Sequence, residues 1–145
     1  MTLVIDSSVI VKWFVQEEGH AEALGLLETT ERICCPDFAL VEAANVLWRK
    51  VRLSEIGPAQ ASEAVGQLAG FFDAVVPSFE LLEAAFELAG RLQHSVYDCM
   101  FLACALRSED DVLVSADERF LTKASENGFA MAVRPLSGQP PALNV

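Results

Sequence analysis

Short apolar runs alternate with helical stretches along this chain, and that alternation restricts the possible folds more than any other feature. Five apolar runs predict strands, at residues 3–5, 32–36, 74–76, 112–114 and 130–133. The stretches between them, rich in Ala, Leu and Glu, predict helices. The strand runs are continuously apolar, as in sheets that helices cover on both faces. The pattern therefore predicts an α/β fold with a parallel five-stranded sheet.

Length and composition indicate one folded domain. The chain has 145 residues, of which 52% are hydrophobic, so it can fill a substantial core. No internal repeat or second domain is visible. We expect a domain at residues 1–134, followed by a surface tail at residues 135–145 that contains three prolines.

The sequence contains no apolar stretch of the roughly 18 to 20 residues that a membrane span requires. The first residues also lack the basic flank of a signal peptide, so we expect a cytoplasmic protein without membrane contact. The four cysteines show no zinc or redox spacing and are interpreted as buried small side chains. His20 and His94 are isolated in the sequence and are expected to be ordinary surface or packing residues.

Acidic residues follow the predicted strands or begin the predicted helices. Asp6 follows the first strand, Asp117 follows the fourth together with Ser115, and Asp98 opens an apolar helix at residues 99–107. Ligands of parallel α/β folds bind beyond the carboxyl ends of the strands. Each of these aspartates can equally be a helix cap, as we expect of Asp37 before a helix at residues 38–51. Both interpretations remain open from the residues alone.

Glu42 differs because it lies within a helix. Its apolar neighbours leave little of the helix polar, and Glu42, Asn45 and Arg49 are spaced three and four residues apart. That spacing places the three side chains on one stripe. The stripe indicates a polar crevice on a mostly buried helix.

Convergence of these acids would require a cation. Two carboxylates about 4 Å apart repel by roughly 4 kcal/mol at an effective dielectric constant near 20. Oxygen ligands without His or Cys favour Mg²⁺ or Mn²⁺. Such an ion binds phosphate oxygens and activates water, so the expected reaction is hydrolysis of a phosphodiester. The formal net charge of −11 argues in the opposite direction, because nucleic-acid binders usually carry a basic surface.

Four segments together resemble the PIN-domain ribonucleases, specifically the VapC-type toxins of type II toxin–antitoxin pairs. The segments are LVIDSSVIVKWF, PDFALVEAANVLWRK, SVYDCMFLACAL and VLVSADERF, in the order and spacing of that family. They span residues 3–120. Each segment is weakly specific by itself, whereas all four in order are strongly specific.

The resemblance implies a three-layer α/β/α sandwich whose acids cluster around Mg²⁺ or Mn²⁺. The family's four acids, which are both catalytic and metal-binding, match Asp6, Glu42, Asp98 and Asp117. Polar residues that orient acids or water match Ser8, Asn45 and Ser115. Basic residues flanking these segments, which could contact RNA, are Lys12, Arg49 and Arg119, together with Lys50, Arg52 and Lys123.

The function that the resemblance implies is that of a metal-dependent endoribonuclease toxin, neutralised by a cognate VapB-type antitoxin and usually a homodimer. Two alternatives remain open. A dehalogenase-like phosphoryl hydrolase would use Asp6 as a nucleophile, but it favours a second aspartate where this chain has Ser8. A non-catalytic interaction domain would use the acids only as helix caps.

Overall fold

The computed structural model describes residues 1–137 and has a five-stranded, all-parallel sheet at its centre. The strand order is β3-β2-β1-β4-β5, which confirms the predicted sheet. The strands are β1 (Thr2–Ile5), β2 (Arg32–Pro36), β3 (Ala74–Val76), β4 (Val112–Ser115) and β5 (Val133–Pro135).

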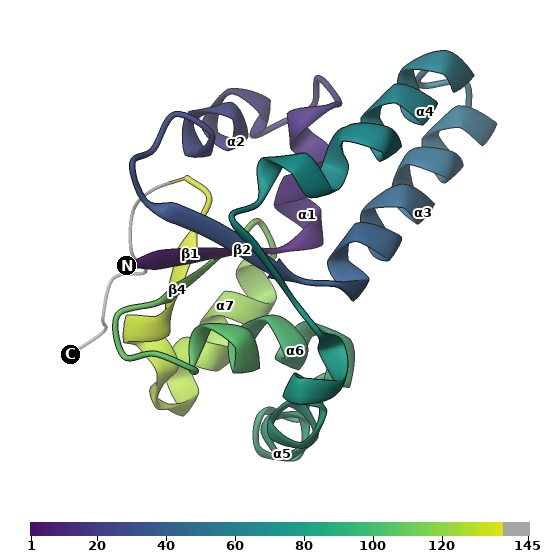
Figure 1. Ribbon diagram of the computed structural model, residues 1–145. Helices are drawn as coiled ribbons and strands as arrows, with labels where there is room; N and C mark the ends of the chain where they lie inside the picture. Colours follow the sequence, from purple (N-terminus) through teal and green to yellow (C-terminus); the bar gives the residue numbers. More distant parts are fainter. Residues whose placement is uncertain (138–145) are drawn as a thin grey trace.

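Helices cover both faces of this sheet, as Figure 1 shows. One side carries α1 (Ser7–Ile10), the 3-10 helix η1 (Val11–Trp13), α2 (His20–Leu26), α3 (Phe38–Arg52), α4 (Pro58–Gln67) and η2 (Leu68–Phe71). The other side carries η3 (Ser78–Leu81), α5 (Leu82–Leu92), α6 (Val96–Ala105), α7 (Glu118–Ala124), η4 (Ser125–Phe129) and η5 (Ala130–Ala132). The fold is therefore a three-layer α/β/α sandwich.

β1 is the central strand and is fully enclosed. It pairs with β2 on one side and with β4 on the other, with Val4 opposite Cys34 and Leu113. Leu3, Val4 and Ile5 are at most 1% exposed. Burial of such a run stabilises the fold by about 1.5 to 3 kcal/mol per side chain. The strand thus gives the residue that follows it, Asp6, a rigid support.

The last strand differs from its prediction. Residues 130–132 form η5, and strand pairing begins only at Val133 and continues to Pro135. Leu136 then donates its backbone N–H to the Ser115 carbonyl at 2.9 Å. The chain therefore remains attached to the sheet beyond residue 134. Residues 138–145 of the expected tail lie outside the described residues.

The helix caps also differ in part from expectation. Asp6 caps α1 by accepting from Ser8 N, and Asp117 caps α7 by accepting from Phe120 N. Asp98 does not open its helix, because α6 begins at Val96 and Ser95 is its cap. Asp37 precedes α3 without a capping hydrogen bond, since its side chain accepts from Ser78 instead.

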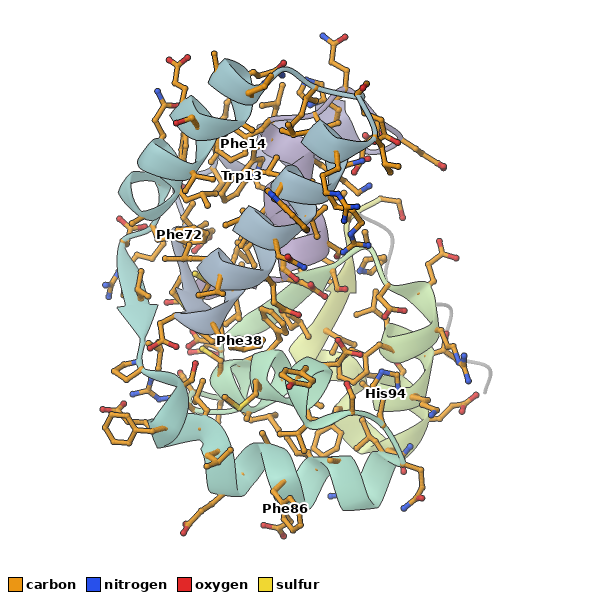
Figure 2. All side chains as sticks on the ribbon, turned by 90° about the vertical axis from the view of Figure 1, so that its right-hand side faces the viewer. Trp13, Phe14, Phe38, Phe72, Phe86 and His94 are labelled. Carbon is orange, nitrogen blue, oxygen red and sulfur yellow. The ribbon has the colours of Figure 1, made fainter. Side chains whose placement is uncertain are left out.

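The four cysteines are free and buried, as predicted. Aromatic side chains fill the space between η1 and the segment after α4. The Trp13 ring lies 5.5 Å from the rings of Phe71 and Phe72, and Phe14 lies 5.6 Å from Phe71. Figure 2 shows Trp13, Phe14 and Phe72 gathered there, whereas Phe86 points outward from α5. Within residues 1–137, no helix combines the length and apolar character needed to cross a membrane.

Candidate active site

The candidate site lies where the strand order reverses. The chain leaves β1 toward β2 and β3, and it returns across the sheet to β4 and β5 on the other side of β1. The carboxyl ends of β1 and β4 therefore lie side by side while their connections run to opposite faces. Ligands of open parallel sheets bind at this kind of position. Asp6 follows β1 here, and Ser115 ends β4.

Asp6 is only 7% exposed, and both of its carboxylate oxygens accept hydrogen bonds. Oδ1 accepts from the backbone N–H of Ser8 at 2.9 Å, and Ser7 Oγ lies 3.3 Å away. Oδ2 accepts from Ser115 Oγ at 2.6 Å. The first turn of α1 and the end of β4 thus fix the orientation of this carboxylate.

Ser8 and Ser115 also connect Asp6 to the segment that carries Asp117. Ser115 Oγ accepts from the backbone N–H of Asp117 at 3.0 Å, and Ser8 Oγ accepts from Ala116 N–H at 3.3 Å. The two serines predicted to orient the acids therefore contact Asp6 or its neighbours. Their hydroxyls hold the loop after β4 against the start of α1.

Glu42 joins the site through Ser7, which was not among the predicted site residues. Ser7 Oγ lies 3.2 Å from Glu42 Oε1 and 3.3 Å from Asp6 Oδ1. Its one hydroxyl proton can therefore be donated to either acid. Asn45, the residue expected in such a role, is exposed and has no side-chain hydrogen bond within the described part of the chain. The pair Ser7 and Ser8 was visible in the sequence, but not which hydroxyl faces Glu42.

The helix α3 is less buried than its sequence indicated. Ala39, Ala43 and Leu47 are buried, whereas Val41 and Trp48 are 71% and 57% exposed. The expectation of a mostly buried helix was therefore wrong. The apolar residues outnumber those that one face of a helix can cover, and the others reach the surface.

Asp98 and Asp117, the other two candidate acids, lie close to each other. Ligand atoms of Asp98, Asp117 and His94 all lie within 4.8 Å of one another. Asp98 comes from the first turn of α6 and Asp117 from the start of α7. Such spacing is short enough for one ion to contact more than one of these groups.

His94 is part of this cluster, and it also packs on the Phe120 ring, so its expected packing role and a place beside the acids are compatible. Its Nε2 lies 2.6 Å from Asp98 Oδ2, and Lys123 Nζ lies 3.5 Å from its Nδ1. Because an ionised carboxylate only accepts, Nε2–H donates to Asp98. The signal in the sequence was the spacing of four residues between His94 and Asp98, although α6 begins only at Val96.

The electrostatics of the metal-free site are unfavourable. Burial raises the pKa of Asp6 above its ordinary value, an effect that the Ser115 and Ser8 hydrogen bonds oppose and the charge of Asp98 reinforces. Desolvation also raises the pKa of Glu42, with further contributions from Asp6 and Asp98. A cation among these groups would reverse both effects.

One open groove of about 390 Å³ unites these residues. Asp6, Asp98 and Asp117 line it, together with residues of η1 and α3, and Glu42 reaches it through Ser7. The lining residues are Asp6, Ser7, Ser8, Val11, Lys12, Glu17, Val46, Lys50, Asp98 and Asp117. Carboxylate oxygens are the ligands that Mg²⁺ and Mn²⁺ prefer, so the donor set fits a hard divalent ion. Of the expected basic residues, Lys12 and Lys50 line the groove, whereas Arg49 and Arg119 are exposed elsewhere.

The fold and the site together define a class: an α/β/α sandwich with a carboxylate centre at the switch point of its sheet. The sequence profile of the PIN domain matches residues 3–126. The chain is 35% identical over 107 residues to Ribonuclease VapC3 of Pyrobaculum aerophilum, covering 72% of this chain and 82% of that protein. This chain therefore belongs to the PIN-domain family and is of the VapC type, as its four segments predicted.

A solved structure supports the fold independently. The crystal structure of PAE2754 from Pyrobaculum aerophilum superimposes with a TM-score of 0.70 at 21% identity. The likeness covers 94% of this chain and 85% of the other. At that identity it bears on the fold alone.

Proposed function

We propose that this chain is a metal-dependent endoribonuclease that hydrolyses RNA phosphodiester bonds and acts as the toxin of a toxin–antitoxin pair. The observation that carries the proposal is the single groove in which Asp6, Asp98 and Asp117, drawn from three distant segments, lie together. Membership of the VapC type supports it, and the similar VapC3 protein is named a ribonuclease.

The acids would hold Mg²⁺ or Mn²⁺, with Asp6 and Asp98 as the principal ligands and Asp117 and Glu42 completing the set directly or through water. A bound divalent ion stabilises charge on a reacting phosphoryl group and lowers the pKa of water. In the hydrolysis, the water oxygen bonds to phosphorus as the bond from phosphorus to the 3′ oxygen breaks. The products carry a 5′-phosphate and a 3′-hydroxyl, and the leaving oxygen takes up a proton.

The chain's own contribution is to hold its acids in fixed orientations before RNA binds. Ser8 N–H and Ser115 Oγ restrain Asp6, and His94 Nε2–H restrains Asp98. Residues that orient ligands in this way typically change metal affinity or activity by 10- to 100-fold when removed.

The proposal includes partners that the VapC type implies. RNA is the substrate, and a VapB-type antitoxin with a basic segment would complement the acidic groove. A homodimer in the cytoplasm is the expected free form, and sedimentation of the purified chain would measure its mass. Exposed apolar side chains such as Phe79 and Phe86, at 78% and 73% exposure, are compatible with an interface between copies.

The test is cleavage of a broad RNA pool by the purified chain, freed of any antitoxin, with Mg²⁺ or Mn²⁺. We expect fragments with 5′-phosphate ends, which a phosphate-specific exonuclease would then degrade. Chelation of the metal should stop the reaction. The proposal fails if no RNA in the pool is cut under either metal.

Asp98→Asn is the matched control, because contaminating nucleases mimic weak activity. The variant keeps the size of the side chain and removes its charge. We expect the melting temperature to stay close to that of the wild type while cleavage is lost. Equal cleavage by both proteins would remove Asp98 from the site and support a non-catalytic role for the acids.

A further inference from the structure

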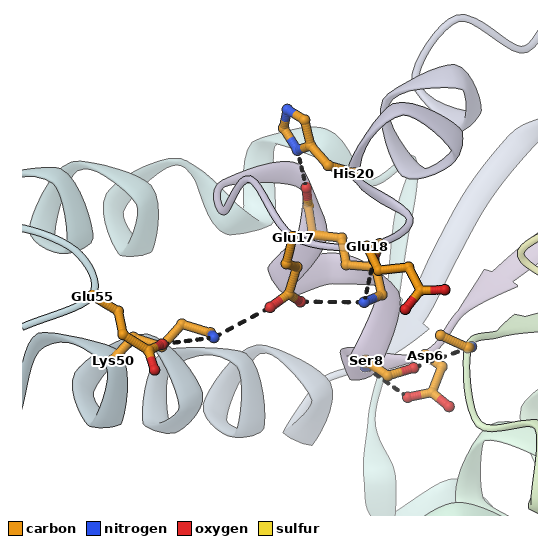
Figure 3. A network of polar contacts seen from close by, with 9 residues as sticks. Asp6, Ser8, Glu17, Glu18, His20, Lys50 and Glu55 are labelled. Carbon is orange, nitrogen blue, oxygen red and sulfur yellow. Dashed lines mark hydrogen bonds and ion pairs between the residues drawn. The ribbon is translucent and has the colours of Figure 1, made fainter. Parts of the chain in front are cut away.

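Two lysines and one glutamate form a connected group on the rim of the groove. Glu17 accepts from Lys12 Nζ through Oε1 at 3.2 Å and from Lys50 Nζ through Oε2 at 3.2 Å. Figure 3 shows this arrangement, in which the Glu17 carboxylate lies between the two ammonium groups. We call Lys12, Glu17 and Lys50 the rim triad.

The rim triad lines the same groove as Asp6, Asp98 and Asp117. Lys12 comes from η1, which follows directly on α1, and Lys50 comes from the last turn of α3. The two lysine side chains are only 16% and 18% exposed. They are therefore held against the groove, unlike freely solvated lysines.

Further contacts keep both lysines in place. Lys12 Nζ also donates to the Glu18 carbonyl at 2.8 Å, and Lys50 Nζ also contacts Glu55 Oε2 at 3.1 Å. Gly19, in a left-handed conformation with φ +88°, leaves room for the Lys12 stem. A Cβ at Gly19 would lie 3.1 Å from Lys12 Cδ.

Hydrogen bonds around the rim triad stabilise the charged forms of Lys50 and Glu17. The hydrogen bond to Glu55 raises the pKa of Lys50, so the ammonium form is stabilised. Partial burial raises the pKa of Glu17, but hydrogen bonds from Lys50 and Lys12 outweigh it and lower the value overall. Glu17 is therefore an anion bound between two cations in the free protein.

The Glu17 carboxylate presents to the lysines what a phosphodiester would present. Both groups offer two oxygens that share one negative charge. An ammonium group has three N–H donors, and each lysine uses two of them on the partners named above. The third donor of each has no partner among residues 1–137. The position between the lysines is thus suited to a phosphate group.

We infer that Lys12 and Lys50 bind an RNA phosphate next to the one that is cleaved, and that this phosphate replaces Glu17 between them. The inference rests on the proposed function and names how the groove recognises its substrate. The subsite also explains how a chain with a formal net charge of −11 accepts a polyanion, because two cations lie beside the acids.

The experiment measures binding separately from cleavage. A fluorescein-labelled single-stranded RNA of about 12 nucleotides is titrated with the Asp98→Asn protein in Mg²⁺, and anisotropy is followed at several salt concentrations. Adding Lys50→Gln should remove one phosphate contact, which reduces the salt slope by about 0.7 for a single strand. The same slope corresponds to about fivefold weaker binding near 0.1 M salt. Lys12→Gln should behave alike.

Glu17→Gln distinguishes replacement from simple support. If phosphate takes the place of Glu17, the neutral variant should bind the RNA more tightly than the parent. Weaker binding by Glu17→Gln would overturn the inference, since Glu17 would then be needed to hold the lysines in the complex. Wild-type affinity and salt slope in Lys50→Gln would overturn it as well.

Two variants control for charge and folding. Arg52→Gln removes one positive charge from the same helix, but its guanidinium lies over the Trp48 ring, 5.0 Å from the centroid, and it does not line the groove. It should leave the RNA affinity unchanged. Lys50→Arg keeps the charge and should restore most of the binding that Lys50→Gln loses, which a folding defect would not do.

RNA cleavage by the wild type and RNA binding by Lys50→Gln test the nuclease proposal and the phosphate subsite separately. If the wild type cleaves RNA and Lys50→Gln binds normally, the subsite is wrong and the nuclease proposal stands. If the wild type cleaves nothing but Lys50→Gln weakens RNA binding, the lysines still bind an RNA phosphate while the nuclease proposal fails.

Discussion

Asp6 shows how one side chain serves both the fold and the candidate site. Its Oδ1 caps α1 through Ser8 N–H, and its Oδ2 is tied to the end of β4 by Ser115. The two interpretations that the sequence left open, helix cap and site acid, are therefore compatible. A cap orients the carboxylate, and an oriented carboxylate is what a metal ligand requires.

His94 is expected to affect metal binding through its contact with Asp98. Because its Nε2–H donates to Asp98 Oδ2, it should position that carboxylate for an ion. We expect His94→Ala to weaken Mn²⁺ binding by about tenfold or more, as removal of such partners typically does. Isothermal titration calorimetry with Mn²⁺ alone measures this without any cleavage assay.

His94→Gln is the informative companion, since its amide can place an N–H near the position of Nε2. Recovery of Mn²⁺ affinity in His94→Gln would support positioning through the hydrogen bond. Unchanged affinity in His94→Ala would contradict the role altogether. His20→Ala is the control, because His20 contacts the Lys12 carbonyl away from the acids.

At the scale of elements, α6 determines where Asp98 lies. Every residue from Cys99 to Ala105 is buried, so the helix is packed on all sides and its first turn carries the polar residues. The sequence predicted an apolar helix opening at Asp98. The structure begins the helix at Val96 and lets Ser95 Oγ accept from Asp98 N–H at 3.3 Å. The Asp98 side chain therefore does not cap the helix.

Ser95→Ala tests this cap. Loss of an N-cap hydroxyl typically costs about 1 kcal/mol, within a range of roughly 0.5 to 2 kcal/mol. Urea unfolding should show this decrease in the free energy of unfolding without a change in slope. Ser62→Ala, on the exposed part of α4, should cause no comparable loss. Equal stability of Ser95→Ala and the wild type would show that the cap contributes nothing.

At the scale of the whole molecule, topology brings the acids together against their own repulsion. β1 and β4 are 109 residues apart at the contact between Asp6 and Ser115, yet they are neighbours in the sheet. Without a cation, the clustered carboxylates destabilise the folded state, and burial is the main cause at Asp6. The stability of the protein should therefore depend on pH and on metal.

Asp6→Asn should stabilise the metal-free protein at neutral pH. The folded-state pKa of Asp6 lies above its ordinary value of 3.8, so the folded chain binds more protons than the unfolded chain between the two values. Stability of the wild type consequently falls as pH rises through that window. In EDTA at pH 7 we expect the variant to melt about 3 °C higher or more, which corresponds to about 1 kcal/mol for a chain of this size.

The comparison should be repeated at lower pH, where the difference in melting temperature should shrink because the raised pKa lets the wild-type carboxyl take up a proton as the pH falls. Excess Mg²⁺ or Mn²⁺ should favour the wild type instead, since binding to the folded state stabilises it. A variant that melts lower than the wild type in EDTA at pH 7 would contradict the unfavourable burial of this charge.

The fold class could be predicted from the sequence, and the four candidate acids could be chosen from it. Continuous apolar runs such as Leu3–Ile5 predicted a parallel sheet because only strands covered on both faces carry them. The start of α6 and the last strand were predicted wrongly, since Ser95 caps α6 and residues 130–132 form η5. Local sequence pattern does not fix such boundaries, because tertiary packing can shift them by a few residues.

Contacts between distant elements determine which neighbours complete the site. Side-chain contacts that the sequence spacing did not predict complete it. Ser7, and not Asn45, contacts Glu42, and His94 contacts Asp98. Lys12 and Lys50 both contact Glu17. Side-chain direction at these positions follows from helix packing and from the crossover between β1 and β4. Sequence spacing encodes neither, because a one-residue rotation of a helix moves every side chain on it by about 100°.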